Sequence, residues 1–212
     1  MRTYVFGAGG HGKVVFDILR AQGIAVEGFI DSRPKSSDVL GVSVFPEAAL
    51  EGFGAVRMVI ALGANHVRRD VVQRIKTLCP KVEFINAIHP TAYVSPLSKM
   101  GVGNVVAAGA IVGPATVVGD HAVINTGAQL DHDCTIQDFV TIAPGAILGG
   151  TVRVGVGTYV AIGSVVRHGI EIGEWSVVGA GSVVLGDMPD RVVAFGSPCR
   201  VIRPRGESDP YL

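Results

Sequence analysis

An aliphatic residue returns at every sixth position between residues 88 and 184, and this period constrains the fold more than any other feature of the chain. The spacing fits neither the helical period of about 3.6 residues nor the two-residue alternation of a strand. A fixed longer period is instead typical of a repeat architecture, in which each repeat packs on its neighbours. The positions are Ile88, Val94, Met100, Val106, Val112, Val118, Ile124, Leu130, Ile136, Ile142, Leu148, Val154, Val160, Val166, Ile172, Val178 and Val184.

A second restriction falls four residues after each aliphatic position, where most side chains are small, as at Ala110, Ser164 and Ser182. Glycine or alanine also follows many aliphatic positions directly, as at Gly113 and Gly149, and we interpret these residues as tight corners. Short straight sides joined by such corners predict a solenoid in which three sides make a coil of about 18 residues.

This pattern resembles that of the hexapeptide-repeat acyltransferases, and the resemblance covers all of residues 88–184. It implies a left-handed parallel β-helix. The handedness comes from the resemblance, because the general preference of parallel crossover connections is for the right hand.

Residues 1–86 follow a different pattern. Arg2–Phe6 predicts a short buried strand, and the glycine turn Gly7–Gly12 follows it at once. Lys13–Ala21 has helical spacing, and Val26–Ile30 predicts a second strand. This order predicts a Rossmann-like α/β domain built on a βαβ unit. Further strands are expected at Val42–Phe45, Arg57–Leu62 and Val82–Ile85, with a helix at Val67–Leu78.

The chain should therefore divide into three parts. We expect the α/β domain over residues 1–86, the β-helix over residues 87–188, and a C-terminal cap and tail over residues 189–212. The repeat fails after Val184, so the cap should cover the open end of the β-helix, and the tail from Gly206 should be mobile.

The glycine turn predicts a phosphate site. Gly7, Gly9 and Gly12 match G-x-G-x-x-G between a strand and a helix, which directs backbone amides and a helix N-terminus at phosphate. Asp31 follows Gly12 by 19 residues, where a ribose-binding acid is expected, although a solvated turn residue is the alternative. One small βαβ unit leaves no second half for a nicotinamide, so a diphosphate carrying another small group fits better than a dinucleotide.

His132 stands between Asp131 and Asp133 in a coil that is otherwise aliphatic and small. A carboxylate beside an imidazole fixes its tautomer and raises its basicity, which suits a general base near neutral pH. The spacing leaves open which aspartate holds the ring, and a plain surface histidine remains an alternative. Residues 18 apart occupy equivalent places on successive coils, which gives one column of Pro114, His132, Gly150 and His168.

Several motifs together resemble those of the bacterial nucleotide-sugar N-acetyltransferases in the sialic-acid O-acetyltransferase-like group, which includes enzymes acting on UDP-bacillosamine precursors and GDP-perosamine. The motifs are Gly7–Gly12, Gly63 with Asn65 and Arg68, Asn86–Pro90, and Asn125–Ala128 with Asp131–Asp133. The resemblance covers essentially the whole chain. It implies a homotrimeric enzyme of polysaccharide biosynthesis that moves acetyl from acetyl-CoA to the 4-amino group of a nucleotide-linked 4-amino-4,6-dideoxy sugar, with acetyl-CoA bound between subunits.

The same resemblance implies residue roles. His132 would be the catalytic base, Asp133 its orienting partner, and the Gly150 amide the oxyanion donor. The implied nucleotide-sugar residues are Gly9, Gly10, His11, Gly12, Asp31, Asn65 and Arg68. The resemblance also places Gly150 and the position of Thr141 beside acetyl-CoA. Gly163, Gly179 and Ala180 are candidates for letting the pantetheine lie against the coils. Arg167, Arg200 and Arg203 are either ligands of the coenzyme phosphates or solvated surface residues. Many relatives carry a second histidine where this chain has Thr141.

Charge and cysteine content exclude other classes. Eighteen basic residues balance eighteen acidic ones, so no global field favours nucleic acid or an anionic membrane. Three cysteines without CxxC spacing indicate neither a disulfide framework nor a zinc site. No apolar run reaches the length of a membrane span and no signal peptide is visible, so we expect a cytoplasmic protein.

Three alternatives remain. A sialic-acid-type O-acetyltransferase would use the same parts on a different acceptor. A non-catalytic scaffold would only bind the nucleotide sugar. A γ-class carbonic anhydrase shares the three-sided β-helix but needs three histidines converging on zinc. Beyond its first coil, the β-helix contains only His121, His132 and His168, and no helix-borne set of histidines accompanies them, so we expect no metal.

Overall fold

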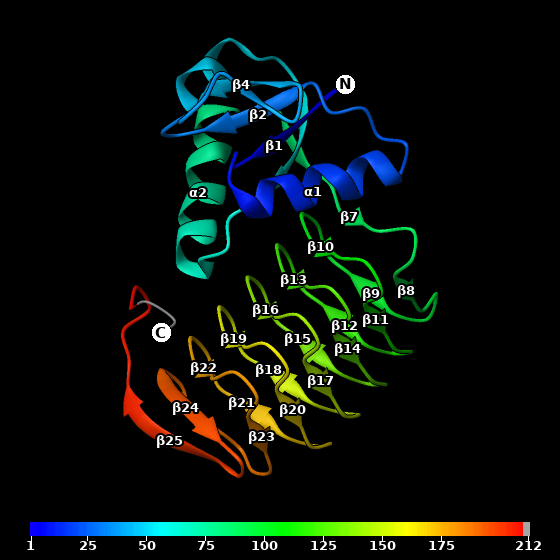
Figure 1. Ribbon diagram of the computed structural model, residues 1–212, viewed down its shortest axis with the longest axis vertical. Helices are drawn as coiled ribbons and strands as arrows, with labels where there is room; N and C mark the ends of the chain where they lie inside the picture. Colours follow the sequence, from blue (N-terminus) through cyan, green and yellow to red (C-terminus); the bar gives the residue numbers. More distant parts are fainter. Residues whose placement is uncertain (210–212) are drawn as a thin grey trace.

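The computed structural model describes residues 1–209 of the 212-residue chain. An α/β domain lies over one side of a stack of short strands, and the last two strands close the far end of that stack (Figure 1).

The N-terminal domain is a six-stranded sheet in the order β3-β4-β2-β1-β5-β6, parallel except for the antiparallel pair β3–β4. Its strands are β1 Arg2–Phe6, β2 Gly28–Asp31, β3 Asp38–Val39, β4 Val42–Pro46, β5 Val56–Ile60 and β6 Val82–Phe84. Its helices are α1 Gly10–Ala21, the 3-10 helix η1 Glu47–Gly52, and α2 Asn65–Leu78. The predicted Rossmann-like fold is confirmed. Helix α1 begins before the expected Lys13, because the glycine turn itself supplies the N-cap, Gly9, and the first helical residues.

Each helix buries an apolar side against the sheet. Val15 and Leu19 of α1 pack with Phe29 of β2, whereas Val72 and Ile75 of α2 pack in a separate cluster. The α1 cluster continues into the β-helix through residues Ala87, Val105, Ala107 and Val123. The two domains therefore share a continuous apolar junction.

The repeat region folds as the predicted left-handed parallel β-helix, with three faces of two-residue strands (Figure 1). The first face contains β7 Ala87–Ile88, β10 Val105–Val106, β13 Val123–Ile124, β16 Thr141–Ile142, β19 Tyr159–Val160 and β22 Val177–Val178. The second face contains β8 Tyr93–Val94, β11 Ile111–Val112, β14 Gln129–Leu130, β17 Ile147–Leu148, β20 Val165–Val166 and β23 Val183–Val184. The third face contains β9 Lys99–Met100, β12 Val117–Val118, β15 Thr135–Ile136, β18 Arg153–Val154 and β21 Glu171–Ile172.

Every aliphatic position of the six-residue period is the second residue of its strand, and those from Val106 onward are buried along the axis. The glycines that directly follow them, such as Gly113 and Gly149, do not make the corners, which corrects our interpretation. A Cβ at Gly113 would lie 2.7 Å from the Asp131 carbonyl carbon on the next coil. The left-handed backbone conformation falls two residues later, as at Ala115 and Thr151. These glycines are therefore required by the close approach of successive coils.

The C-terminal cap is an antiparallel hairpin that extends the first face, formed by β24 Val192–Gly196 and β25 Cys199–Pro204. Beyond it, Glu207 bridges Arg69 of α2 and Arg191 at 2.7 Å each. Buried Arg205 donates to the carbonyl oxygen of Asp209 at 2.7 Å. Residues 206–209 thus pack against α2, contrary to the expected mobility of the tail. The remainder of that expectation falls on residues 210–212, outside the described residues.

None of the helices in residues 1–209 combines the length and the apolarity that a membrane crossing requires.

Candidate active site

The glycine turn lies at the carboxyl edge of the N-terminal sheet, directly after β1. Gly7 adopts a φ of 107°, and a Cβ on Gly12 would collide with the Gly7 carbonyl, so both positions require glycine. Gly9 and Gly10 are exposed with open space where a Cβ would stand. Backbone amides and the N-terminus of α1 are therefore accessible to an anion.

Asp31 ends β2 beside this turn. Its Oδ2 accepts the Ala8 amide at 2.9 Å and its Oδ1 accepts the Arg33 amide at 2.8 Å. The structure thus brings Asp31 to the glycine turn, as the nucleotide interpretation requires. The carboxylate also holds the turn in shape.

His132 and Gly150 meet at the edge between the second and third faces, on neighbouring coils. His132 Nδ1 is 2.7 Å from Asp133 Oδ2, whereas Asp131 Oδ1 accepts the backbone amide of His132 at 2.8 Å. Asp133 therefore orients the ring, which answers the question that the spacing left open. A Cβ at Gly150 would lie 2.5 Å from His132 Nε2, so the imidazole covers a place that only glycine leaves free.

The electrostatics of this edge favour a base. The hydrogen bond to Asp133 is the main cause that raises the pKa of His132, and the charge of Asp131 adds to it. With Nδ1–H donated to Asp133, Nε2 is the basic atom, and it forms no hydrogen bond within residues 1–209. The Gly150 N–H has no acceptor in the described part of the chain either. An exposed base therefore lies next to a buried backbone donor that has no acceptor among the described residues.

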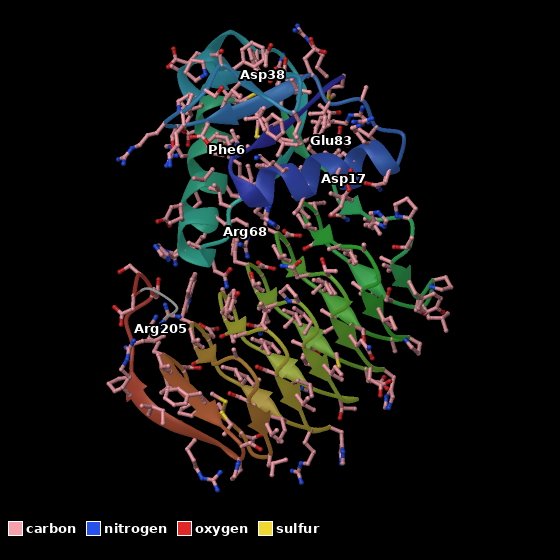
Figure 2. The ribbon with its side chains drawn as sticks, viewed as in Figure 1. Phe6, Asp17, Asp38, Arg68, Glu83 and Arg205 are labelled. Atoms are coloured by element: carbon pink, nitrogen blue, oxygen red, sulfur yellow. The ribbon has the colours of Figure 1, made fainter. Side chains whose placement is uncertain are left out.

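Asn65 and Arg68 lie at the junction of the two domains. Both side chains are buried, and Arg68 points towards the β-helix in Figure 2. Arg68 donates to the carbonyls of His121 and Phe139 at 2.9 Å, and Asn65 Nδ2 donates to that of Gly157 at 3.0 Å. The three acceptors form one column on the edge between the third and first faces. These side chains therefore join the two domains, and their expected role in closing the nucleotide site stays a prediction.

The hydroxyl of Thr141 also forms hydrogen bonds inside the protein. It donates to Asn65 Oδ1 at 2.7 Å and accepts from Arg68 at 3.2 Å. Thr141 lines a pocket of about 370 Å³ between the domains, together with His11, Gly63, Ala64, Val123, Asn125 and Tyr159. Burial and the nearby Arg68 charge lower the pKa of His11 to about 4, so this imidazole is neutral near pH 7. The pocket thus joins the glycine turn to the first face.

Sequence reasoning missed Tyr159 and Asn125 as pocket residues. Tyr159 pairs with Thr141 on the next coil, and burial raises the pKa of its hydroxyl. The 18-residue interval that related His132 to Gly150 also relates Thr141 to Tyr159, so the signal was present. Asn125 belongs to a motif whose resemblance was noted without a role.

The glycine and alanine candidates for acetyl-CoA fall on two different edges, whereas Thr141 lies in a strand of the first face. Gly150 lies on the edge between the second and third faces, and Arg167 and His168 lie on the same edge in the next coil. Gly163 and Ala180 are exposed on the edge between the first and second faces. Gly179 is buried there, where a Cβ would lie 2.7 Å from Phe195 Cβ. Arg203 pairs with Asp209 at 3.4 Å, and Arg200 is exposed on β25. A single chain does not gather these residues into one groove.

The His132 edge and the pocket are also separate. In a three-sided prism the edge between the second and third faces lies opposite the first face, which carries the pocket and the N-terminal domain (Figure 1). One chain therefore presents the base and the pocket on opposite sides.

Buried His121 and partly buried His11 should make the protein sensitive to acid. Burial is the main cause that lowers the pKa of His121 to about 4, as it does for His11. As the pH falls from 6.5 to 4, the unfolded chain takes up the proton first, so stability is complete above pH 6.5 and is lost towards pH 4. Each histidine can account for roughly 3 kcal/mol.

His121→Asn should therefore reduce the loss of unfolding free energy between pH 7 and pH 5 in urea titrations. Asparagine tolerates the φ of 54° at this position, so the backbone is preserved. An unchanged pH slope in this variant would assign the acid sensitivity to other groups.

Within residues 1–209 there is no group of three or more His, Cys, Asp or Glu side chains arranged to hold a metal ion.

Comparison with known proteins relates both domains to one group. The family model described as the PglD N-terminal domain matches residues 2–75. The UDP-N-acetylbacillosamine N-acetyltransferase of Bacillus subtilis is 39% identical over 111 residues, covering 49% of this chain and 50% of that protein. A second match, the uncharacterized protein L142 of Acanthamoeba polyphaga mimivirus, is 30% identical over 105 residues and covers 21% of its length. The chain thus aligns with half or less of these two relatives.

Solved structures match nearly the whole chain. PerB from Caulobacter crescentus, in complex with CoA and GDP-perosamine, is 36% identical with a TM-score of 0.89, covering 96% of this chain and 98% of that one. The acetyltransferase domain of PglB from Neisseria gonorrhoeae, in complex with acetyl coenzyme A, is 33% identical with a TM-score of 0.88, covering 95% and 98%.

Proposed function

Because the chain belongs to the family of nucleotide-sugar N-acetyltransferases, we propose that it transfers acetyl from acetyl-CoA to the 4-amino group of a nucleotide-linked 4-amino-4,6-dideoxy sugar. The observation that carries this proposal is the His132–Asp133 pair over Gly150, which places an unbonded imidazole nitrogen beside a backbone N–H that has no acceptor among the described residues. The family resemblance supplies the substrates, since PerB was solved with CoA and GDP-perosamine.

In this reaction His132 Nε2 removes a proton from the sugar amine as the amine nitrogen attacks the thioester carbonyl. Asp133 holds the ring and stabilises the imidazolium that forms. The Gly150 N–H donates to the oxyanion of the tetrahedral intermediate. Collapse of that intermediate expels the sulfur of coenzyme A, which takes up the proton and leaves as a thiol.

The nucleotide diphosphate would bind at the glycine turn. Gly9 and Gly10 allow close approach to the backbone, Gly12 keeps the turn compact, and the N-terminus of α1 adds positive potential. Asp31 holds the turn and has lone pairs left for the nucleoside. Neutral His11 lies between this turn and the pocket, where it could bond a phosphate or the sugar.

A homotrimer would unite the two halves of the site. Four outward residues of the second face are exposed and apolar, namely Tyr93, Ile111, Ile147 and Val165. They form a strip that is interrupted only by the exposed Gln129 of β14, and such a strip favours association. If the second faces met around a common axis, the His132 edge of one chain would lie beside the edge of its neighbour that carries Asn125 and Gly163. Acetyl-CoA would then run between the two chains, and each base would serve its neighbour's pocket.

Ile147→Glu should therefore break the assembly, because the charge would be buried at the centre of that strip. We expect light scattering to report monomers and acetyl transfer to fall at least about a hundredfold, since misplaced catalytic groups cost rates of this order. Val117→Glu, at the equivalent strand position on the third face, should leave the assembly unchanged. A monomeric wild-type protein with full activity would contradict the shared site.

The acceptor decides between this function and its alternative, a sialic-acid-type O-acetyltransferase with the same base and donor. We expect coenzyme A release with UDP-, GDP- or dTDP-linked 4-amino sugars and none with free sialic acid. Release with sialic acid alone would establish the O-acetyltransferase, and release with neither would leave a binding scaffold. We assign the activity to the cytoplasm, where the three free cysteines would remain reduced, and to polysaccharide biosynthesis.

A further inference from the structure

Thr141 occupies the place where the family resemblance suggested a contact with acetyl-CoA, yet its hydroxyl is engaged inside the protein. We infer that Thr141 is a positioning residue for the sugar acceptor, and that it acts through Asn65 and Arg68 on the turn between β5 and α2. The inference rests on the proposed function for its kinetic consequence and on the buried contacts for its structural part.

Arg68 provides the first link. Its Nη1 donates to the Leu62 carbonyl in the β5–α2 turn at 2.7 Å, and its Nε donates to the His121 carbonyl of the β-helix at 2.9 Å. Nη2 donates to the Phe139 carbonyl at 2.9 Å. A planar guanidinium with donors in fixed directions thus connects the turn to two successive coils.

Asn65 provides the second link, and its amide can be placed in only one way. Nδ2 faces two carbonyl acceptors, those of Gly157 and Thr158, at 3.0 and 3.2 Å. Oδ1 faces two donors, Arg68 Nη2 at 2.9 Å and the Thr141 hydroxyl at 2.7 Å. Of the two donors to Asn65 Oδ1, the Thr141 hydroxyl is the one that the β-helix supplies.

These contacts set the width of the pocket. Gly63 and Ala64, in the same turn, line one side, while Thr141 lines the other, between Val123 and Tyr159 on the adjacent coils. The proton of the Thr141 hydroxyl is donated to Asn65, and a lone pair accepts from Arg68. The hydroxyl cannot donate to a thioester carbonyl at the same time. Its effect on the reaction must come from the position of the opposite wall.

Thr141→Val removes the hydroxyl at nearly constant volume and should loosen that wall. We expect the KM for the nucleotide sugar to rise about tenfold, equivalent to about 1.4 kcal/mol, while kcat and the KM for acetyl-CoA change less than about twofold. Thr141→Ser keeps the hydroxyl and should restore the wild-type KM. In an Asn65→Ala background, Thr141→Val should add little, because residues in one network are not additive.

Thr77→Val is the matched control. It is the same substitution on α2, where the exposed hydroxyl only bonds the Gln73 carbonyl of its own helix, and it should leave all three constants unchanged. Thr141→Val could instead leave the sugar KM unaltered while the KM for acetyl-CoA rises or kcat falls. That result would overturn the inference in favour of direct contact with the coenzyme. Unchanged constants would overturn it as well.

Hydrogen exchange separates this inference from the proposed function. Amides of residues 63–68 should exchange faster in Thr141→Val than in Thr141→Ser or wild type, whatever the substrate is. Equal exchange in all three proteins would refute the network role. If wild-type protein acetylates no nucleotide sugar while the exchange difference is present, the proposed function fails and the structural coupling stands.

Discussion

His132→Asn should lower kcat/KM for the amino-sugar acceptor by about a thousandfold, within the range that general-base catalysis supplies. Asparagine can keep a polar contact with Asp133 but cannot accept the proton of the attacking amine. The effect is measured as the rate of coenzyme A release, which a thiol reagent detects. Calorimetric binding of the nucleotide sugar should remain near wild type, because the nucleotide is proposed to bind at the glycine turn. His89→Asn, in the first coil, is the matched control and should keep full activity.

A pH profile adds a second test of the same base. The base must be neutral to act, so activity should rise with pH through the raised pKa of His132. Asp133 is the largest cause of that raised pKa. Asp133→Asn should therefore move the acidic limb of the profile to lower pH while reducing the maximal rate, because the ring is no longer held. A drop of only a few fold in His132→Asn, or an unmoved limb in Asp133→Asn, would count against the assignment.

Arg68→Met should cost the largest free energy of unfolding of any exchange considered, about 3–5 kcal/mol, because buried carbonyl acceptors on both domains lose a charged donor. At this chain length the loss corresponds to a fall in melting temperature of about 10 °C. Calorimetry and urea titration measure it. Methionine has a similar volume, so the loss reports hydrogen bonds rather than a cavity.

Arg74→Met on the same helix is the matched control for that experiment. Arg74 makes a partly exposed ion pair with Glu47, and pairs of this kind contribute about 0–1 kcal/mol. Equal stability of the Arg68 and Arg74 variants would mean that Arg68 does not join the domains. Two separate unfolding transitions in Arg68→Met would show that the two domains unfold independently once the contacts of Arg68 between them are lost.

The neighbouring arginine shows how far the same helix extends over the prism. The guanidinium of Arg69 lies 4.6 Å from the ring of Trp175, and Trp175 occupies the fourth place in the column of His121, Phe139 and Gly157. All four have a left-handed backbone conformation, and their carbonyls accept hydrogen bonds from Asn65, Arg68 or Arg205. Helix α2 therefore follows one edge of the β-helix, and the packed residues 206–209 hold it from the other side.

The sequence alone determined the β-helix, its register and the pairing of His132 with Gly150. All three follow from one local period, because a repeat of six on a three-sided coil relates residues 18 apart without any long-range information. The glycine turn was readable for a similar reason, since the tight turn after β1 tolerates only glycine at two positions.

Only the tertiary structure decided what Asn65, Arg68 and Thr141 do. Their partners are mostly backbone carbonyls 53 to 93 residues away, and every residue carries a carbonyl, so no sequence pattern marks such an acceptor. The choice of Asp133 over Asp131 depended on the local backbone, since the left-handed conformation of Asp133 turns its side chain towards the ring. The period determined where His132 stands, and packing of the domains determined that the pocket lies on the opposite side.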